Sequence, residues 1–175
     1  MRGNSFKWDL FLVRMAVVIV TGTPGSGKTE VARFLSKTLG FVHVNVNRLI
    51  RSRNLWSSYD KKRRCYVVDK KKLVRMMLAE IKKHHDVIFD SHMSHYLPKK
   101  YVDVCIVTTC EIAELKTRLQ RRRYSALKVR ENLEAEIFQL CLTEAQEQKH
   151  KIISLDTTKG FDKKKLLRKV RSWIS

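Results

Sequence analysis

Residues 22–29 read Gly-Thr-Pro-Gly-Ser-Gly-Lys-Thr and bring three glycines, a lysine and hydroxyl side chains together in one short stretch. The spacing fits GxxxxGK[ST], the pattern of a loop whose backbone N–H groups point at phosphate oxygens. Lys28 would place a cation on the β- and γ-phosphates, and the hydroxyl of Thr29 can ligate Mg²⁺. The motif predicts a nucleoside triphosphate site but leaves the reaction open, since GTPases, ATPases and kinases all use it.

A carboxylate and two histidines follow a short apolar run further along the chain. Asp90 comes directly after Val87-Ile88-Phe89, at the predicted end of a buried strand, which is where parallel sheets bind ligands. It could hold Mg²⁺ directly or through water, or it could cap a turn. His92 and His95 are candidates to orient a water or an acceptor hydroxyl, although either could be a packing histidine.

Phosphoryl transfer also needs cations along the transferred group. Arg118 and Arg122 are four residues apart on one predicted helix face, and residues 116–130 contain seven Lys or Arg and no Asp or Glu. A solvated face would usually mix both signs of charge, so this segment favours a polyanion site over a merely exposed basic helix. Arg51 lies in a polar segment after the second predicted strand, where a second nucleotide could dock.

The elements that must position these residues are five apolar strands alternating with helices. We expect the strands at 15–20, 41–46, 86–90, 102–109 and 151–155. We expect helices at 29–40, 69–83, 111–122, 126–149 and 162–174, and a short one at 48–53 within an otherwise irregular segment 47–68. This alternation predicts an α/β fold, a parallel sheet with helices on both faces. We interpret residues 15–175 as one domain and residues 1–14 as an N-terminal extension.

The charge balance is strongly basic, with 37 Lys and Arg against 17 Asp and Glu, or +20. Such a charge favours polyanion partners, whether nucleotides, RNA or acidic protein. The four cysteines, Cys65, Cys105, Cys110 and Cys141, lack zinc-ligand spacing and are typical of buried reduced thiols in a cytoplasmic protein. The apolar run at 10–20 contains Arg14 and is too short to span a bilayer, so we expect no membrane association.

Several further segments accompany the loop: NVNRLIR (45–51), VVD (67–69), DSH (90–92), RLQRRRY (118–124) and ENLEAEIFQLCLTEA (131–145). With these, the chain resembles the adenylate kinase isoenzyme six family over about residues 15–157. Members of that family are small archaeal and eukaryotic P-loop proteins that combine adenylate kinase and ATPase activity with a role in small-ribosomal-subunit maturation. The resemblance implies a P-loop NTPase fold of the nucleoside-monophosphate-kinase type, with a five-stranded parallel sheet and a short lid.

Residue by residue, the resemblance implies a monophosphate-binding segment at about 45–68, with Arg51 on the AMP phosphate, and a lid at about 121–131. It implies Mg²⁺ ligation by Thr29 and Asp90, with ATP as phosphoryl donor. The nucleotide-binding residues would be Gly22, Gly25, Ser26, Gly27, Lys28, Thr29, Glu30 and Arg122. The catalytic residues would be Lys28, Asp90, His92, Arg118 and Arg122.

Two departures from the family pattern bear on these expectations. The family usually has Gly-Asp where this chain has Asn47-Arg48, which alters the predicted AMP pocket. The lid usually reads Arg-Gly-Tyr, and here Arg123 replaces the glycine. An arginine there restricts the hinge if the position needs a positive φ.

Three functions stay open at this point. The first is transfer from Mg-ATP to AMP, giving two ADP, with hydrolysis as a side reaction. The second is an ATPase switch in ribosome assembly, with ribosomal RNA and a platform protein of the small subunit as partners. The third is a kinase for nucleic-acid 5′-hydroxyls, in which Asp90 or His92 orients the hydroxyl.

Overall fold

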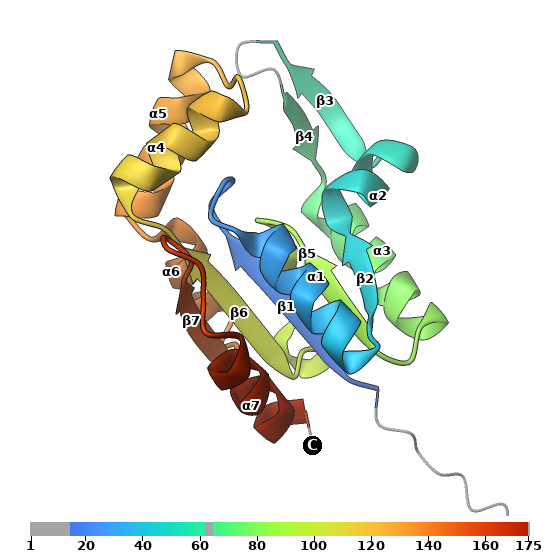
Figure 1. The fold of residues 1–175 in the computed structure, drawn as a ribbon. Helices are drawn as coiled ribbons and strands as arrows, with labels where there is room; N and C mark the ends of the chain where they lie inside the picture. The colour runs from blue at the N-terminus through green and yellow to red at the C-terminus, as the bar shows by residue number, and fades with distance from the viewer. Residues whose placement is uncertain (1–14, 62–64, 175) are drawn as a thin grey trace, which may run out of the picture.

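The predicted five-stranded parallel sheet is confirmed. A computed structural model describes residues 15–61 and 65–174 (Figure 1). The strands follow the order β2-β5-β1-β6-β7, and each neighbouring pair is parallel. Their bounds are Val17–Gly22 (β1), Val42–Asn45 (β2), Val87–Asp90 (β5), Val104–Thr109 (β6) and Ile152–Asp156 (β7). β1 is central and buried along its whole length, as its continuous apolar run predicts.

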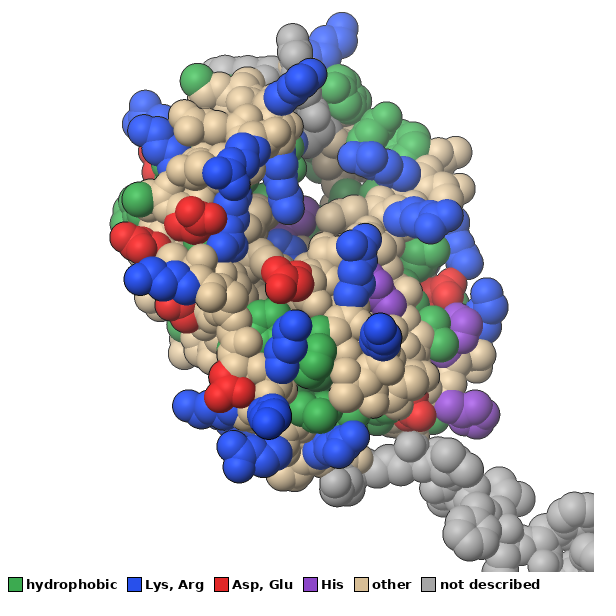
Figure 2. Space-filling view, in the orientation of Figure 1, with side chains coloured by type: hydrophobic (Ala, Val, Ile, Leu, Met, Phe, Trp, Pro, Cys, Tyr) green, Lys and Arg blue, Asp and Glu red, His purple; other side chains and the backbone are tan. Residues whose placement is uncertain are grey.

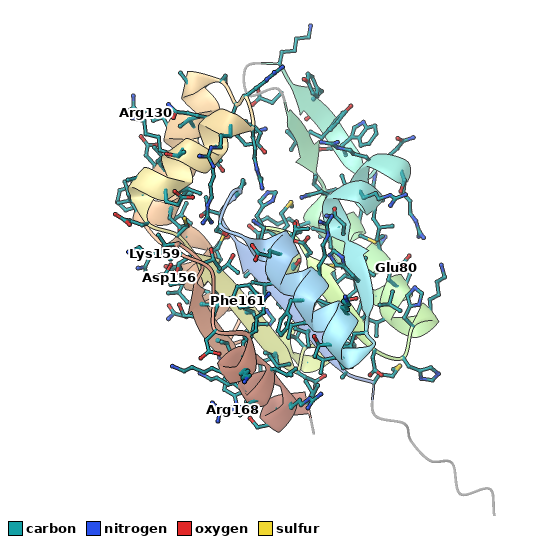
Figure 3. The ribbon with its side chains drawn as sticks, viewed as in Figure 1. Glu80, Arg130, Asp156, Lys159, Phe161 and Arg168 are labelled. Atoms are coloured by element: carbon teal, nitrogen blue, oxygen red, sulfur yellow. The ribbon has the colours of Figure 1, made fainter. Side chains whose placement is uncertain are left out.

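Helices cover both faces of this sheet. Helices α1 (Lys28–Leu39) and α7 (Lys163–Ile174) pack on the face that receives Val18 and Val20 of β1. Phe161 lies just before α7 (Figure 3). Its ring meets that of Phe34 of α1 edge to face, with 5.7 Å between ring centroids. Helices α3 (Lys70–Lys83) and α6 (Leu140–Glu147) pack on the opposite face. Among the described residues, no helix is long and apolar enough to cross a bilayer.

Two smaller units stand beyond the carboxyl ends of the strands, on either side of the end of β1 (Figure 1). One consists of α4 (Ile112–Arg121) and α5 (Ala126–Ile137), which pack together through Leu115, Leu119 and Val129. The other consists of α2 (Val46–Ser52) and an antiparallel hairpin of β3 (Trp56–Asp60) and β4 (Cys65–Val68). Short 3₁₀ turns, Ser94–Tyr96 and Lys99–Tyr101, follow β5.

The prediction of one long helix over 126–149 is wrong. The chain forms α5 and α6 instead, and Gln139 between them has a left-handed φ of 49°. The break lets Val129 pack on α4 while Ala145 packs on the main sheet, which one straight helix cannot do. Ile137 and Leu140, on either side of the break, are 58% and 48% exposed.

The segment 47–68 is more ordered than its polar sequence predicts. The short helix is confirmed but begins at Val46, and the β3–β4 hairpin was not expected. The proposed extension, residues 1–14, lies outside the described residues.

Candidate active site

The phosphate-binding loop joins β1 to α1, and two glycines fix its path against the neighbouring strands. Gly22 has φ 138°, and a Cβ there would lie 2.3 Å from the carbonyl oxygen of Thr108. Gly27 is the N-cap of α1 at φ 86°, and a Cβ there would lie 2.8 Å from Thr157 Oγ1. No side chain fits at either position, so the ends of β6 and β7 hold the loop closely.

Ser26 and Glu30 make contacts that support this loop and the first turn of α1. The Ser26 hydroxyl is buried and lies 2.6 Å from the Thr108 hydroxyl, so it braces the loop against β6. The Glu30 amide donates to the carbonyl of Gly27 at 3.0 Å, within the first turn of α1. The Glu30 side chain is exposed at the mouth of the cavity.

Lys28 is only 8% exposed. Its Nζ donates a 2.9 Å hydrogen bond to the carbonyl of Thr23. Burial lowers the pKa of Lys28 to about 8, although the charge of Asp90 acts in the opposite direction. The side chain is therefore mostly protonated at neutral pH, as a phosphate-binding lysine must be.

Asp90 is 2% exposed at the end of β5. His43 Nε2 and Asn45 Nδ2, both on β2, lie 3.4 Å from its Oδ2. Burial raises the pKa of Asp90, but hydrogen bonds from His43 and Thr29 and the charge of Lys28 outweigh it and hold the pKa below its usual range. Asp90 is thus a carboxylate at neutral pH.

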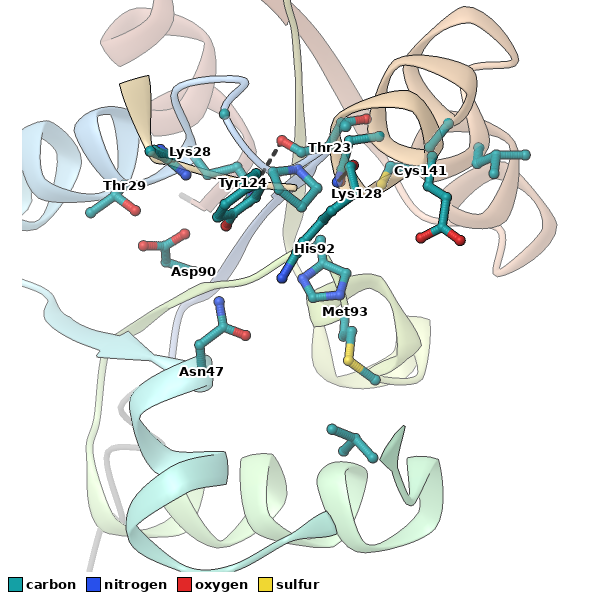
Figure 4. A pocket seen from close by; sticks show the side chains of 18 of the residues that line it. Thr23, Lys28, Thr29, Asn47, Asp90, His92, Met93, Tyr124, Lys128 and Cys141 are labelled. Atoms are coloured by element: carbon teal, nitrogen blue, oxygen red, sulfur yellow. Dashed lines mark hydrogen bonds between the residues drawn. The ribbon is translucent and has the colours of Figure 1, made fainter. Parts of the chain in front are cut away.

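The residues predicted to hold Mg²⁺ fit that ion. Thr29 and Asp90 point toward one another beside Lys28 (Figure 4), and they offer a hydroxyl and an ionised carboxylate. Mg²⁺ prefers such oxygen ligands and usually keeps water and substrate phosphates for its other positions. No three His, Cys, Asp or Glu of the described residues are grouped so that they could hold a metal ion by themselves. Thr29 and Asp90 would hold the ion, which would supply positive charge to offset the charge of the donor phosphates.

His92 lines the cavity and is half-buried. Burial, with the charges of Lys28 and His95, lowers the pKa of His92 to about 4. It lies near the end of the Lys128 side chain (Figure 4). A neutral imidazole here can accept a hydrogen bond from a water or a hydroxyl group.

Of the two alternatives for His95, orienting a reacting group or packing, the structure supports packing. Its side chain is fully buried, with Nδ1 2.8 Å from Thr21 Oγ1 and Nε2 2.9 Å from Glu144 Oε2. His95 therefore links α6 to the end of β1, behind the loop.

The two predicted arginines differ in their surroundings. Arg118 donates from Nε to Glu114 at 2.8 Å and from Nη2 to the carbonyls of Thr157 and Thr158 at 3.0 and 2.9 Å. Its guanidinium thus ties the segment after β7 to α4, and its action on a transferred group stays a prediction. Arg122 is the C-cap of α4 and lines the cavity.

The predicted lid corresponds to the turn between α4 and α5 and to the first half of α5. Arg123 has φ 56° in this turn, which is the left-handed region that glycine adopts without strain. The turn therefore requires the positive φ that the family's glycine would supply.

One cavity of about 1030 Å³ brings most of these residues together. Its sides are the α4–α5 pair and the α2–hairpin unit, and Figure 2 shows the hollow between them. The predicted residues that line it are Gly25, Gly27, Lys28, Thr29, Glu30, Arg51, Asp90, His92, Arg118 and Arg122. Gly22 and Ser26 are not among the lining residues and instead pack the loop against β6. The volume is at the upper limit for a single small-molecule site and leaves room for two ligands.

Sequence reasoning missed several lining residues. They are Tyr59, Tyr66, Tyr124, Lys128 and Asn132, whereas Asn47, expected at the AMP pocket, does line the cavity. It also missed His43 and Asn45, although their alternation in Val42–Asn45 places both on one face of β2.

Comparison with known proteins agrees with this geometry. Residues 18–139 match the protein-family model described as AAA domain. A Caenorhabditis elegans protein named adenylate kinase isoenzyme 6 homolog is 35% identical over 131 residues, covering 74% of this chain and 72% of that protein. A Dictyostelium discoideum protein of the same name is 28% identical over 159 residues, covering 90% of each chain.

Solved structures show the same fold at low identity. The shikimate kinase from Acinetobacter baumannii superposes with a TM-score of 0.62 at 16% identity, covering 91% of this chain and 93% of that one. A sugar kinase from a Janibacter species gives 0.60 at 16% identity, covering 91% and 94%. From its sequence relatives and its P-loop kinase fold, the chain belongs to the adenylate kinase isoenzyme 6 family.

Proposed function

We propose that this protein transfers the γ-phosphoryl group of Mg²⁺-bound ATP to AMP, giving two ADP, and hydrolyses ATP when water takes the place of AMP. The observation that carries the proposal is the single cavity that runs from Lys28 and Asp90 to Arg51 on α2. A donor and an acceptor can therefore meet inside one cavity. The names of the curated relatives support AMP as the acceptor.

In this proposal each predicted site residue has its own role. The loop amides and Lys28 hold the donor phosphates, and Thr29 and Asp90 hold the metal. Arg122 and Arg118 offset charge on the transferred group, while Arg51 holds the acceptor phosphate. His92 is neutral and orients the attacking water in hydrolysis. The lid is short, so water is incompletely excluded and hydrolysis competes with transfer.

A three-way assay of the purified protein with Mg-ATP tests this proposal. The protein is assayed alone, with AMP and with structured RNA. ADP formed from AMP supports the kinase. Hydrolysis that only RNA stimulates would instead support an assembly ATPase, and label on RNA ends would support a polynucleotide kinase.

We also propose a role in small-ribosomal-subunit maturation, in the cytoplasm, with ribosomal RNA and a platform protein of that subunit as partners. The resemblance to the family and the charge of +20 support this role. Figure 2 shows many Lys and Arg and few Asp or Glu on the face that carries α1 and α7. The exposed cations of α7 are Lys163, Lys164, Lys165, Arg168, Lys169 and Arg171.

A further inference from the structure

The β3–β4 hairpin presents two tyrosine rings to the cavity. Tyr59 and Tyr66 are directly paired across the two strands and are 50% and 42% exposed. Both line the same cavity as Lys28. Large aromatic rings that stay half-exposed at the wall of a ligand cavity offer a surface to that ligand.

Neighbouring rings hold these tyrosines in place. Tyr66 stacks on Trp56, with 4.3 Å between centroids and an interplanar angle of 27°. Tyr59 meets Tyr66 edge to face at 5.1 Å and 62°. The rings are therefore ordered before any ligand binds, so a planar ligand would lose little further side-chain entropy on stacking against them.

Cross-strand aromatic pairs also stabilise hairpins, and a two-stranded hairpin by itself is marginal. That role explains why Trp56 and Tyr66 stack. It leaves unexplained why Tyr59 and Tyr66 border the cavity rather than a covered surface. α2, which precedes the hairpin in the chain, contributes the apolar Ile50 and the cationic Arg51 to the lining of the same cavity.

We propose that Tyr59 and Tyr66 form the surface on which the base of the acceptor nucleotide stacks, while Arg51 holds its phosphate. The inference rests on the proposed transfer to a nucleoside monophosphate and adds the residues that recognise the base. Every nucleobase has a flat π face, and stacking on an aromatic side chain strengthens binding substantially. A sugar phosphate without a base would gain nothing from this surface.

A comparison of two ligands on two proteins tests the proposal. Calorimetry measures the binding of AMP and of ribose 5-phosphate while a non-hydrolysable ATP analogue and Mg²⁺ fill the donor site. On the wild type, AMP should bind more tightly than ribose 5-phosphate by about 5- to 150-fold. In Tyr59→Ala/Tyr66→Ala, that advantage should disappear, while the affinity for ribose 5-phosphate should stay unchanged.

Two further variants separate stacking from support of the hairpin. Tyr59→Phe/Tyr66→Phe keeps both rings and should bind AMP like the wild type. Tyr66→Leu keeps apolar volume without a ring and should weaken AMP alone, even if the double alanine variant fails to fold. Val67→Ala, on the same hairpin but outside the cavity lining, is the matched control and should change neither affinity.

Equal weakening of AMP and ribose 5-phosphate, or no weakening of either, would overturn the stacking proposal. The measurements also distinguish failure of the stacking proposal from failure of the proposed function. If the wild type phosphorylates AMP and the double alanine variant keeps the same KM for AMP, stacking is wrong and the kinase stands. If the wild type forms no ADP from AMP, the proposed function itself is wrong.

Discussion

Lys28 Nζ donates a 2.9 Å hydrogen bond to the carbonyl oxygen of Thr23, five residues earlier in the phosphate-binding loop. The loop thus provides its own acceptor for the buried ammonium group. A bound β- or γ-phosphate would offer a charged acceptor in place of this neutral one, and hydrogen bonds between charged groups are stronger. Exchange of the Thr23 carbonyl for phosphate is the step that we expect on nucleotide binding.

Lys28→Ala should abolish both phosphoryl transfer and hydrolysis while the protein remains folded. The substitution removes the point charge on the transferred group, which should cost several kcal/mol of transition-state stabilisation. Turnover and circular dichroism measure the two effects. Lys37→Ala, in the last turn of α1, is the control and should keep full activity. Near-normal turnover in Lys28→Ala would show that the loop does not act on phosphate.

Asp90→Asn and His92→Ala should affect different reactions. Asp90→Asn should damage every Mg²⁺-dependent reaction, because an amide is a weaker metal ligand than a carboxylate. His92→Ala should reduce hydrolysis more than transfer, since water needs to be oriented whereas Arg51 holds AMP. Rates of ADP formation with and without AMP measure the difference. Equal losses in both reactions for His92→Ala would remove its separate role.

A buried histidine pair should make stability depend on pH. His150 Nε2 lies 2.8 Å from the carbonyl of His95, and its buried Nδ1 has no hydrogen-bond partner in the part of the chain that the structure describes. Burial lowers the pKa of His150, although this hydrogen bond raises it and the charge of Lys99 adds to the lowering. Burial also lowers the pKa of His95, against the opposing charge of Glu144.

With folded-state pKa values below the unfolded value of about 6.5, the unfolded chain binds protons first as the pH falls. The free energy of unfolding should therefore be highest above about pH 6.5 and decrease below it, by at most about 1.4 kcal/mol per pH unit for each histidine. Urea unfolding at pH 5 to 7 measures the slope. His150→Gln should flatten it and the exposed-site control His85→Gln should not. An unchanged slope in His150→Gln would show that protonation of His150 does not cause this pH dependence.

The face that carries α1 and α7, with the exposed cations of α7, should bind structured RNA in a salt-dependent way. Counterion release gives a log–log slope of about −0.7 to −0.9 for each phosphate neutralised. Replacing Lys163, Lys164 and Lys165 with Gln should reduce the slope by about 2 to 3 units if each contacts one phosphate. The affinity for ATP should stay unchanged, since these side chains are exposed on α7. Undetectable RNA binding at low salt would leave the kinase as the whole function.

The central part of the fold could be predicted because its sequence pattern is compatible with few other secondary structures. An apolar run such as Val17–Val20, followed by the glycine loop and the Val31–Leu35 face of α1, is typical of a buried strand and its crossover helix. The helix expected from residue 69 forms as α3, and Asp69 caps it, since its carboxylate accepts from the amides of Lys71 and Lys72.

The rest depended on tertiary contacts that local patterns do not contain. Apolar periodicity through 126–149 gave no reason for the left-handed Gln139, because the two halves pack on different partners. Asn45 could not be linked to Asp90 without the register that pairs them across β2 and β5. Tyr59 and Tyr66 come together only because β3 and β4 pair as a hairpin. These two strands are short, and their sequence pattern is too weak to predict the hairpin.

The fate of the γ-phosphoryl group tests the central claim most directly. The wild-type protein is incubated with Mg²⁺, AMP and ATP labelled at the γ-phosphorus, and the products are separated. If Lys28, Asp90 and Arg51 bring donor and acceptor together in one cavity, the label should appear in the β-phosphoryl group of ADP made from AMP. Label found only in inorganic phosphate, with AMP unconsumed, would contradict the account.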